Sequence, residues 1–229
     1  MDIARFIQIF IVQGGIGLIY LLIAYKILKR EKKGINFILS CFYICGGLGV
    51  IINIIYAFII NETIVLTLHF ITYFVYCLSL VFLLLTVLIL EKSLDVITRK
   101  FSLLIICVFS ILILGLLFIP NGIKINVTTN WKPEWSWPFF IYSVIVCSLS
   151  VIFPTIYYSI KLYNKFEHQK LRQKWKCFLI GIFSYYFLYY GTSLSNTLAD
   201  PNFRLIWSLI SLSSLFSLYF IYYSVAKQV

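Results

Sequence analysis

Charged residues are scarce in this sequence. Lys, Arg, Asp and Glu together make up 12% of its 229 residues, and only eight residues are acidic. A soluble domain carries about twice that charged fraction. Apolar residues reach 62% instead. This composition predicts a membrane protein with no separate soluble domain.

The apolar stretches contain no Lys, Arg, Asp or Glu at depth, and this absence excludes several functions. A retinal protein needs a buried lysine, and ion-coupled transporters usually hold ionisable groups where the ion binds. His69 and His168 are the only histidines, which are too few ligands for an intramembrane zinc hydrolase. No Gly-x-Ser-x-Gly nucleophile motif is present. We therefore expect no enzymatic activity, no cofactor and no bound metal.

Cysteines are absent from the predicted outer loops, so an outer disulfide is not expected. Cys41 and Cys45 lie one helical turn apart, but no His or acidic residue is near enough in sequence to complete a metal site. We interpret all six cysteines as buried thiols that act as small apolar residues.

Seven apolar runs are each long enough to cross a hydrocarbon core of about 30 Å as a helix. They cover residues 6–25, 35–60, 64–90, 101–119, 138–160, 177–198 and 203–226. The sequence therefore predicts an all-α polytopic membrane protein, with residues 1–229 forming a single seven-transmembrane-helix bundle.

The basic residues alternate between the two sides of these runs. Fifteen of the nineteen fall on one side: Lys26, Lys29, Arg30, Lys32, Lys33, Lys92, Arg99, Lys100, Lys161, Lys165, Lys170, Arg172, Lys174, Lys176 and Lys227. The other side has Arg5, Lys124, Lys132 and Arg204. Because translocating basic residues is unfavourable, the richer side is cytoplasmic. This places the N-terminus outside and the C-terminus inside a multi-pass protein, which we expect in the cell membrane.

The net charge of +11 is explained by this orientation rather than by a nucleic-acid partner. Its expected secondary effect is attraction to anionic lipid headgroups at the cytoplasmic face.

Three tryptophans gather in the longest outer segment, residues 121–138. Trp131, Trp135 and Trp137 suit the membrane–water interface, where the ring and its N–H both find partners. The alternative is that they cap a ligand site.

Two glycine clusters occupy similar depths in the first and second runs: Gly14, Gly15 and Gly17, and then Gly46, Gly47 and Gly49. Small residues let helices approach closely in lipid, so we predict close packing of the first helix on the second. A midplane cavity or a flexible point is the alternative. Pro154 predicts a kink near 151–154, which could serve as a hinge.

Strongly polar residues of the spans lie in the outer halves of their helices. Gln8, Gln13, Asn53, His69 and Asn196 share this depth with Thr67, Thr72, Tyr189, Thr192, Ser193, Ser195 and Trp207. Unpaired amides are costly in hydrocarbon, so these groups face either one another or a wet cavity. The first alternative is a packing network. The second is a pocket open to the outside between the second, third, sixth and seventh helices, with candidate ligand residues Gln13, Asn53, His69, Tyr189, Asn196 and Trp207.

The fifth connection spaces Lys161, Lys165, Arg172 and Lys176 along one helical face, which predicts that its flanking helices extend into the cytoplasm. Orientation alone explains this charge. The alternative hypothesis is that these basic residues bind a cytoplasmic signalling protein.

The chain resembles the seven-helix sensor region at the N-terminus of some prokaryotic histidine kinases. The likeness lies in the total span length, the tryptophan-rich outer segment before the fifth helix, Leu171-Arg172-Gln173-Lys174 leading into Leu179-Ile180-Gly181, and Asn196. The hallmarks of G-protein-coupled receptors are missing, since Leu90-Glu91-Lys92 ends the third run. The resemblance implies a membrane sensor, whose family members normally continue into a catalytic domain.

We therefore expect a stand-alone sensor that binds a small or amphipathic ligand from outside and signals to a separate cytoplasmic partner. Helix rearrangement about Pro154 and the glycine clusters would carry the signal. The alternatives are a non-catalytic membrane subunit or scaffold, and a facilitator for a small neutral solute.

Overall fold

The computed structural model describes residues 7–30 and 34–226 of the chain. Arg5, Lys32, Lys33 and Lys227, which contributed to the predicted orientation, lie outside these residues, as does the side chain of Gln8.

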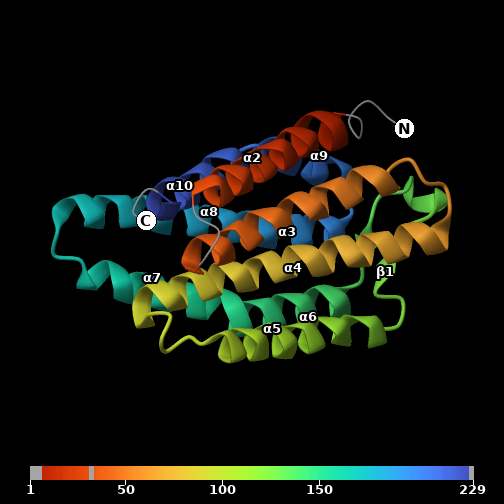
Figure 1. Cartoon of the computed structure of the whole chain (residues 1–229). Coiled ribbons are helices and arrows are strands. Elements are labelled where there is room, and N and C mark those ends of the chain that lie inside the picture. The colour runs from red at the N-terminus through yellow and green to blue at the C-terminus, as the bar shows by residue number, and fades with distance from the viewer. Residues whose placement is uncertain (1–6, 31–33, 227–229) are drawn as a thin grey trace.

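Long helices make up nearly all of the fold (Figure 1). A π-helical stretch, η1 (Ile7–Gln13), continues as α2 (Gly14–Arg30), and α3 (Gly34–Tyr56), α4 (Glu62–Lys92) and α5 (Arg99–Leu114) follow. A 3₁₀ turn, η2 (Gly115–Phe118), extends α5. The rest comprises α6 (Trp137–Cys147), a π turn η4 (Ser148–Ile152), α7 (Phe153–Lys165), α8 (Gln169–Leu198), α9 (Pro201–Ser211) and α10 (Ser214–Ala226).

Within the described residues, six helical segments are long and apolar enough to cross a membrane. They are Gly34–Tyr56, Glu62–Lys92, Arg99–Phe118, Trp137–Lys165, Gln169–Leu198 and Pro201–Val225. The protein is therefore an all-α, multi-pass membrane protein by the length and composition of its helices. The first predicted span is not among the six; there the chain is π-helical over Ile7–Gln13 and α-helical over Gly14–Arg30.

Residues that favour helix starts set several boundaries. Asn61, Thr98, Ser136 and Asp200 each have extended backbone and accept a hydrogen bond from a backbone N–H three residues later. The second predicted span ends at Tyr56 rather than at residue 60, and residues 57–61 form the connection to α4.

A short hairpin interrupts the helical fold between α5 and α6. The strands β1 (Ile123–Lys124) and β2 (Glu134–Trp135) pair antiparallel, with Ile123 opposite Trp135, and a 3₁₀ turn η3 (Val127–Thr129) lies between them. Ile125 beside β1 is fully buried against Tyr56 and Val65, which docks the hairpin on α3 and α4. We call this end of the bundle the hairpin end.

The helices α2, α3, α4, α7, α8 and α10 contact one another in a closed ring. Most of the apolar part of α4 is buried, whereas most of the segment Arg99–Phe118, which comprises α5 and η2, is exposed, so α5 lies at the periphery. α3 packs between α2 and α4, α8 packs on α10 and α7, and α10 also contacts α2. α2 starts at the hairpin end, and α10 finishes at the opposite end (Figure 1).

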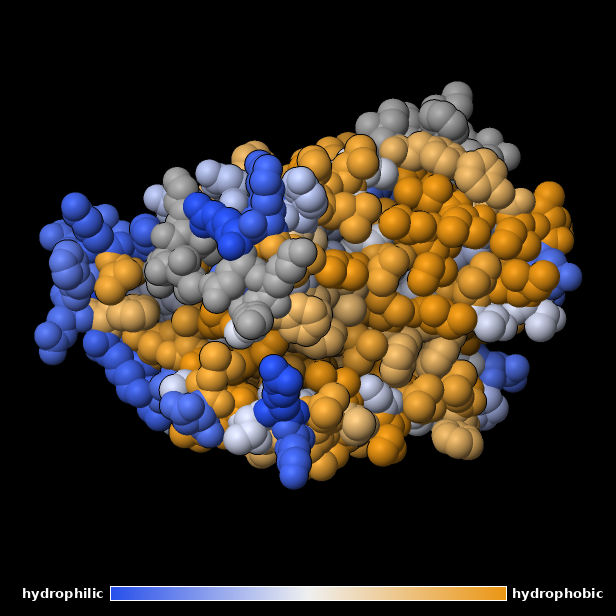
Figure 2. All heavy atoms as spheres, in the orientation of Figure 1, coloured by the Kyte–Doolittle hydropathy of each residue, from blue (hydrophilic) through white to orange (hydrophobic). Residues whose placement is uncertain are grey.

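That opposite end, which we call the basic end, carries the extension formed by α7 and α8. Hydrophilic residues gather there, while the surface over α3 and α4 is largely apolar (Figure 2). The indole nitrogen of the buried Trp175 on α8 donates to the Ser159 carbonyl on α7 at 2.7 Å, and its ring stacks on Phe178. This contact joins the two helices in the extension.

Candidate functional site

A cavity of about 300 Å³ lies in the hairpin half of the bundle. Residues from η1, α2, α3, α4, α8, α9 and α10 line it, together with the segment from Trp131 to Trp135. All six predicted ligand residues lie in its wall: Gln13, Asn53, His69, Tyr189, Asn196 and Trp207. Thr72, Thr192, Ser193 and Ser195 lie there too, whereas Thr67 does not. The second, third, sixth and seventh predicted helices, between which the pocket was expected, all contribute to the wall. The first predicted helix contributes as well.

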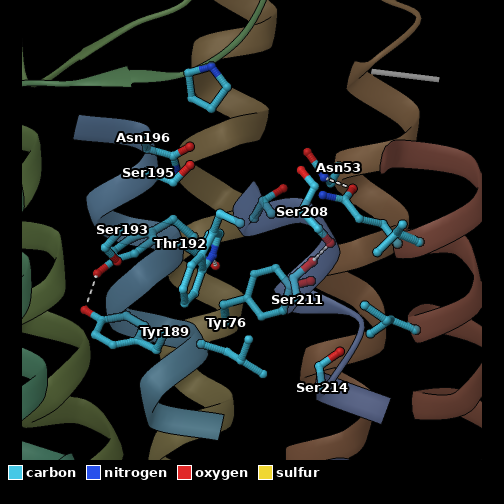
Figure 3. Close-up of a pocket in the computed structure, with 18 of the residues that line it drawn as sticks. Asn53, Tyr76, Tyr189, Thr192, Ser193, Ser195, Asn196, Ser208, Ser211 and Ser214 are labelled. Atoms are coloured by element: carbon cyan, nitrogen blue, oxygen red, sulfur yellow. Dashed lines mark hydrogen bonds between the residues drawn. The ribbon is translucent and has the colours of Figure 1, made fainter. Parts of the chain in front are cut away.

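One face of α8 forms a polar wall. Tyr189, Thr192, Ser193 and Asn196 recur at the spacing that places side chains on one side of a helix (Figure 3). Opposite them, the indole nitrogen of Trp207 donates to Thr192 Oγ1 at 3.0 Å. The Trp207 ring lies where a Cβ on Gly191 would be, so a glycine is needed for α9 to approach α8 this closely.

The seventh predicted span is broken beside the cavity. α9 ends at Ser211 and α10 begins at Ser214, and the backbone N–H groups of Leu212 and Ser213 reach carbonyls three residues back. Ser208 and Ser211 bond carbonyls of their own helix, while the buried Ser214 hydroxyl has no partner among the described residues. Figure 3 shows these three serines across the cavity from α8. The predicted seventh span does form one segment long enough to cross a membrane, Pro201–Val225, but its helix is irregular at residues 212–213. The sequence Ser211-Leu212-Ser213-Ser214 could have indicated this irregular turn, because serine competes for backbone hydrogen bonds.

Tyrosines form the floor of the cavity. The Tyr20 hydroxyl donates to the Tyr185 hydroxyl at 3.2 Å, and Ser79 Oγ lies 3.2 Å from the same Tyr185 oxygen. Glycines of α3 make room for the rings: a Cβ on Gly46 would meet the Tyr20 ring, and one on Gly49 would come within 2.9 Å of Tyr76.

The glycine clusters therefore differ from the simple packing expected. Gly17, Gly46 and Gly47 do hold α2 against α3, with Val50, Tyr20 and Leu21 as their neighbours. Gly49 faces Tyr76 on α4 instead. Gly14 and Gly15 make no close approach, since a Cβ on Gly15 would meet nothing within 4 Å, and both lie where the π-helical stretch becomes α-helical.

Pro154 has a local effect at its predicted position. The π turn Ser148–Ile152 directly precedes it, and the Phe153 N–H bonds the Ser148 carbonyl five residues back. Proline lacks an N–H and its ring crowds the carbonyl four residues earlier, so a wider turn accommodates it.

His69 is held through both of its ring nitrogens. The buried Trp135 indole donates to Nε2 at 3.2 Å, and the Tyr56 hydroxyl lies 3.0 Å from Nδ1. Because an indole N–H can only donate, Nε2 must accept, so the proton of this neutral imidazole is on Nδ1 and points to Tyr56.

The tryptophans of the hairpin segment divide between the two predicted roles. Trp135 is buried and Trp131 half-buried, and both line the cavity, so the interface prediction is wrong for Trp135. Trp137 is 53% exposed, which fits an interface position. The difference between Trp135 and Trp137 comes from the hairpin, in which Trp135 pairs with Ile123. The spacing of the tryptophans in the sequence does not reveal this pairing.

Two further contacts join helices around the cavity. Asn53 Nδ2 donates to Gln13 Oε1, which links α3 to η1. On the far wall, the Tyr73 hydroxyl bonds Ser143 and lies 3.1 Å from the Tyr189 hydroxyl, and Cys147 Sγ lies 3.9 Å from Cys77 Sγ. These buried thiols sit within a hydroxyl network rather than among apolar groups alone.

Arg204 lies in the cavity wall under the hairpin segment. Its Nη2 donates to the Pro133 carbonyl at 2.6 Å, and its Nε donates to the Ser195 carbonyl at 3.4 Å. In the sequence analysis, Arg204 and Lys132 were only counted among the four basic residues on the outer side, and no further role was sought for them. Both line the cavity.

The packing-network and pocket interpretations both describe part of this region. Gln13, Asn53, His69, Tyr189 and Trp207 are hydrogen-bonded. The Asn196 amide has no hydrogen bond to a described residue, and the buried Thr72 and Ser214 hydroxyls have none either. Of these groups, the Asn196 amide is open to an occupant of the cavity, whereas the Thr72 and Ser214 oxygens are enclosed by protein atoms.

The predicted docking residues lie on two helices. α7 ends at Lys165 and α8 begins at Gln169, so Lys161 and Lys165 do not share a helical face with Arg172 and Lys176 as predicted. Both helices continue past the predicted apolar runs, α7 to Lys165 and α8 from Gln169, while their extension into the cytoplasm stays a prediction.

These basic side chains have different environments. Lys161 and Lys165 both pair with Glu91 on α4, at 2.9 and 2.8 Å. The Arg172 guanidinium lies over the Tyr163 ring, 4.9 Å from its centroid, while Lys176 is exposed. Only part of this charge is therefore available to a partner.

No family model, curated protein or solved structure matches this chain. Within the described residues, no group of three or more His, Cys, Asp or Glu side chains could hold a metal ion. The site is therefore interpreted from its own geometry.

Proposed function

We propose that this protein is a seven-helix membrane receptor that binds a small or amphipathic ligand from outside and signals to a separate cytoplasmic protein. The carrying observation is the cavity of about 300 Å³, to which seven helical segments and the hairpin segment contribute. Its volume is at the lower end of the range typical of small-molecule sites. The resemblance to kinase sensor regions points the same way.

The proposed orientation puts the hairpin end outside and the basic end in the cytoplasm. Residues 7–30 would form the seventh crossing, since seven π-helical residues precede the 17 residues of α2. A helix of this combined length can span the hydrocarbon core. The cavity then opens in the outer half.

An unpartnered amide favours a receptor over a scaffold. Interhelical hydrogen bonds in membranes contribute about 0.6–2 kcal/mol each, so a packing network gains only from groups that are paired. Asn196 lines the cavity without making such a bond to a described residue. A ligand or water would satisfy its amide.

The inner half of the bundle favours a receptor over a facilitator. A solute would have to pass Phe42, Tyr43, Leu83, Phe178 and Ile221, which are all fully buried. The Tyr43 hydroxyl also donates to the Leu218 carbonyl at 2.8 Å, which ties α3 to α10 below the cavity.

The test is a screen of small molecules for thermal stabilisation of the purified full chain in uncharged detergent. Asn196→Leu should abolish stabilisation by a cavity ligand while leaving the unliganded melting temperature nearly unchanged, because the amide makes no bond to a described residue. Asn202→Leu is the control, since Asn202 is exposed and does not line the cavity.

Two outcomes would contradict the proposal. Loss of folded protein in the Asn196→Leu variant but not in the Asn202→Leu control, with no stabilising molecule found, would favour the scaffold. Transport of the stabilising molecule into proteoliposomes made with the protein alone would favour the facilitator.

A further inference from the structure

The wall of the cavity carries positive charge and no negative charge. Among its described lining residues, Arg204 and Lys132 are the charged ones, and none is Asp or Glu. His69 adds no charge, because its Nε2 accepts the Trp135 N–H. A cationic ligand would therefore be repelled, and a neutral or anionic ligand accepted.

The acidic residues near Arg204 do not neutralise it directly. Glu134 on β2 is near enough to attract the guanidinium, but no ion pair joins Arg204 to a described residue within 4.0 Å. The Asp200 carboxylate instead caps α9 by accepting from the Phe203 N–H at 2.7 Å. Neither acid lines the cavity.

Arg204 also keeps unused donors. A guanidinium has five N–H groups in a planar fork. Only two of the five donate to described residues, one to Pro133 and one to Ser195. A charged group at this depth without a close counter-ion is costly, and a guanidinium pairs best with a planar or tetrahedral oxyanion that takes two N–H groups at once.

The rest of the cavity suits the body of an organic molecule. Trp207 and Tyr76 supply aromatic surface, and Asn196 supplies an amide that has no partner among the described residues. The occupant should therefore carry an anionic group at the hairpin end and an aromatic or hydroxyl-bearing body below it.

We infer that the cavity binds a small organic anion, whose carboxylate or similar oxyanion pairs with Arg204. This inference rests on the proposed function, since it names the class of ligand that the receptor takes. A soluble anion fits better than a phospholipid, because about 300 Å³ leaves no room for two acyl chains.

The probes are sodium benzoate and benzamide, which share a ring and differ in charge. The melting temperature of the full chain in uncharged detergent is measured with each, against sodium chloride at the ionic strength of the benzoate sample. Benzoate should raise it by about 3 °C or more at saturation, and benzamide by less than half as much.

Two variants identify the residue responsible. Arg204→Gln should remove the benzoate effect, while its amide can still donate to the Pro133 carbonyl and keep the hairpin docked. If the Arg204→Gln variant fails to fold, Arg204→Lys takes its place. This variant keeps the positive charge but loses the planar fork of N–H groups, so benzoate should stabilise it only weakly. Lys124→Gln, which removes an exposed cation outside the cavity, should respond as the unmodified protein does.

Each adverse result has a distinct meaning. Equal stabilisation by benzamide and benzoate, or an Arg204→Gln protein that still responds to benzoate, would overturn the anion inference and leave the receptor proposal standing. Absence of any benzoate effect in a protein that other molecules stabilise through Asn196 would also overturn it. A protein that no molecule stabilises would contradict both.

Discussion

The contact between His69 and Trp135 can be tested by removing the indole donor. Trp135→Phe keeps an aromatic ring against Tyr73 and Phe139 but removes the donor to His69 Nε2. A buried acceptor left without a partner costs about 1–3 kcal/mol. We expect the melting temperature to fall by several degrees, as measured by thermal unfolding in detergent.

Trp137→Phe is the matched control, because Trp137 is 53% exposed and has no role in the cavity. It should change the melting temperature by less than about 1 °C. Equal effects of the two substitutions would mean that the His69 contact adds nothing.

Gly46 and Gly15 should differ sharply in their tolerance of a methyl group. A Cβ on Gly46 would collide with the Tyr20 ring, which is packed against Phe42 and Tyr43 and cannot easily move. Overpacking of this kind costs about 1–3 kcal/mol. Gly46→Ala should therefore lower the yield of folded protein on size-exclusion chromatography.

Gly15→Ala should be close to neutral, since nothing lies within 4 Å of the added atom. A similar loss in both variants would argue that the glycines matter for flexibility rather than for space.

The site residues that the sequence reveals are those whose chemistry is out of place in lipid. Gln13, Asn53, His69 and Asn196 stand out because an amide or imidazole needs a partner there. Ser208, Ser211 and Ser214 do not stand out, because a serine can always bond its own helix. Arg204 was not predicted as a site residue for another reason: it lies in an expected outer connection, where a basic residue needs no functional explanation.

At the level of elements, the π turn before Pro154 acts as a one-residue insertion. Deleting Leu149, which is 64% exposed within Ser148–Ile152, should convert the wide turn into an α-helical one and keep the faces of α6 and α7 aligned. We expect folded protein close to the normal yield, as judged by size-exclusion chromatography.

Deleting Ile145 in the regular part of α6 is the comparison. It should rotate everything before it by about 100° relative to α7 and move Ser143 away from Tyr73 and Tyr189. If the two deletions were equally harmful, the π turn would contain no extra residue that the helix can lose.

The elements differ in how well sequence predicts them. Turn residues such as Asn61 and Asp200 mark helix starts clearly, because their side chains satisfy backbone donors. The break between α9 and α10 and the hairpin depend on contacts with distant parts of the chain. Trp135, for example, is fixed by Ile123 and by His69, 66 residues away in sequence.

For the whole molecule, the decisive question is whether residues 7–30 cross the membrane. If they do, the described chain starts and ends on opposite faces, as the positions of α2 and α10 in Figure 1 suggest. A fluorescent protein fused after Val229 should then fluoresce in the cytoplasm, while a periplasm-dependent phosphatase inserted after Asn130 should be active outside.

A phosphatase fused after Val229 that was active outside would contradict this orientation. It would also turn the cavity toward the cytoplasm, and the receptor would have to take an intracellular ligand. The positive-inside distribution predicts the orientation strongly because it sums many residues, whereas the cavity depends on a few.

Three of the five tryptophans, Trp131, Trp135 and Trp207, stand in the wall of the cavity. Indole emission responds to the polarity and the quenching groups around the ring, so filling this space should alter the intrinsic fluorescence of the protein. The chain thus carries its own optical reporter, and a ligand search can begin without attaching a dye.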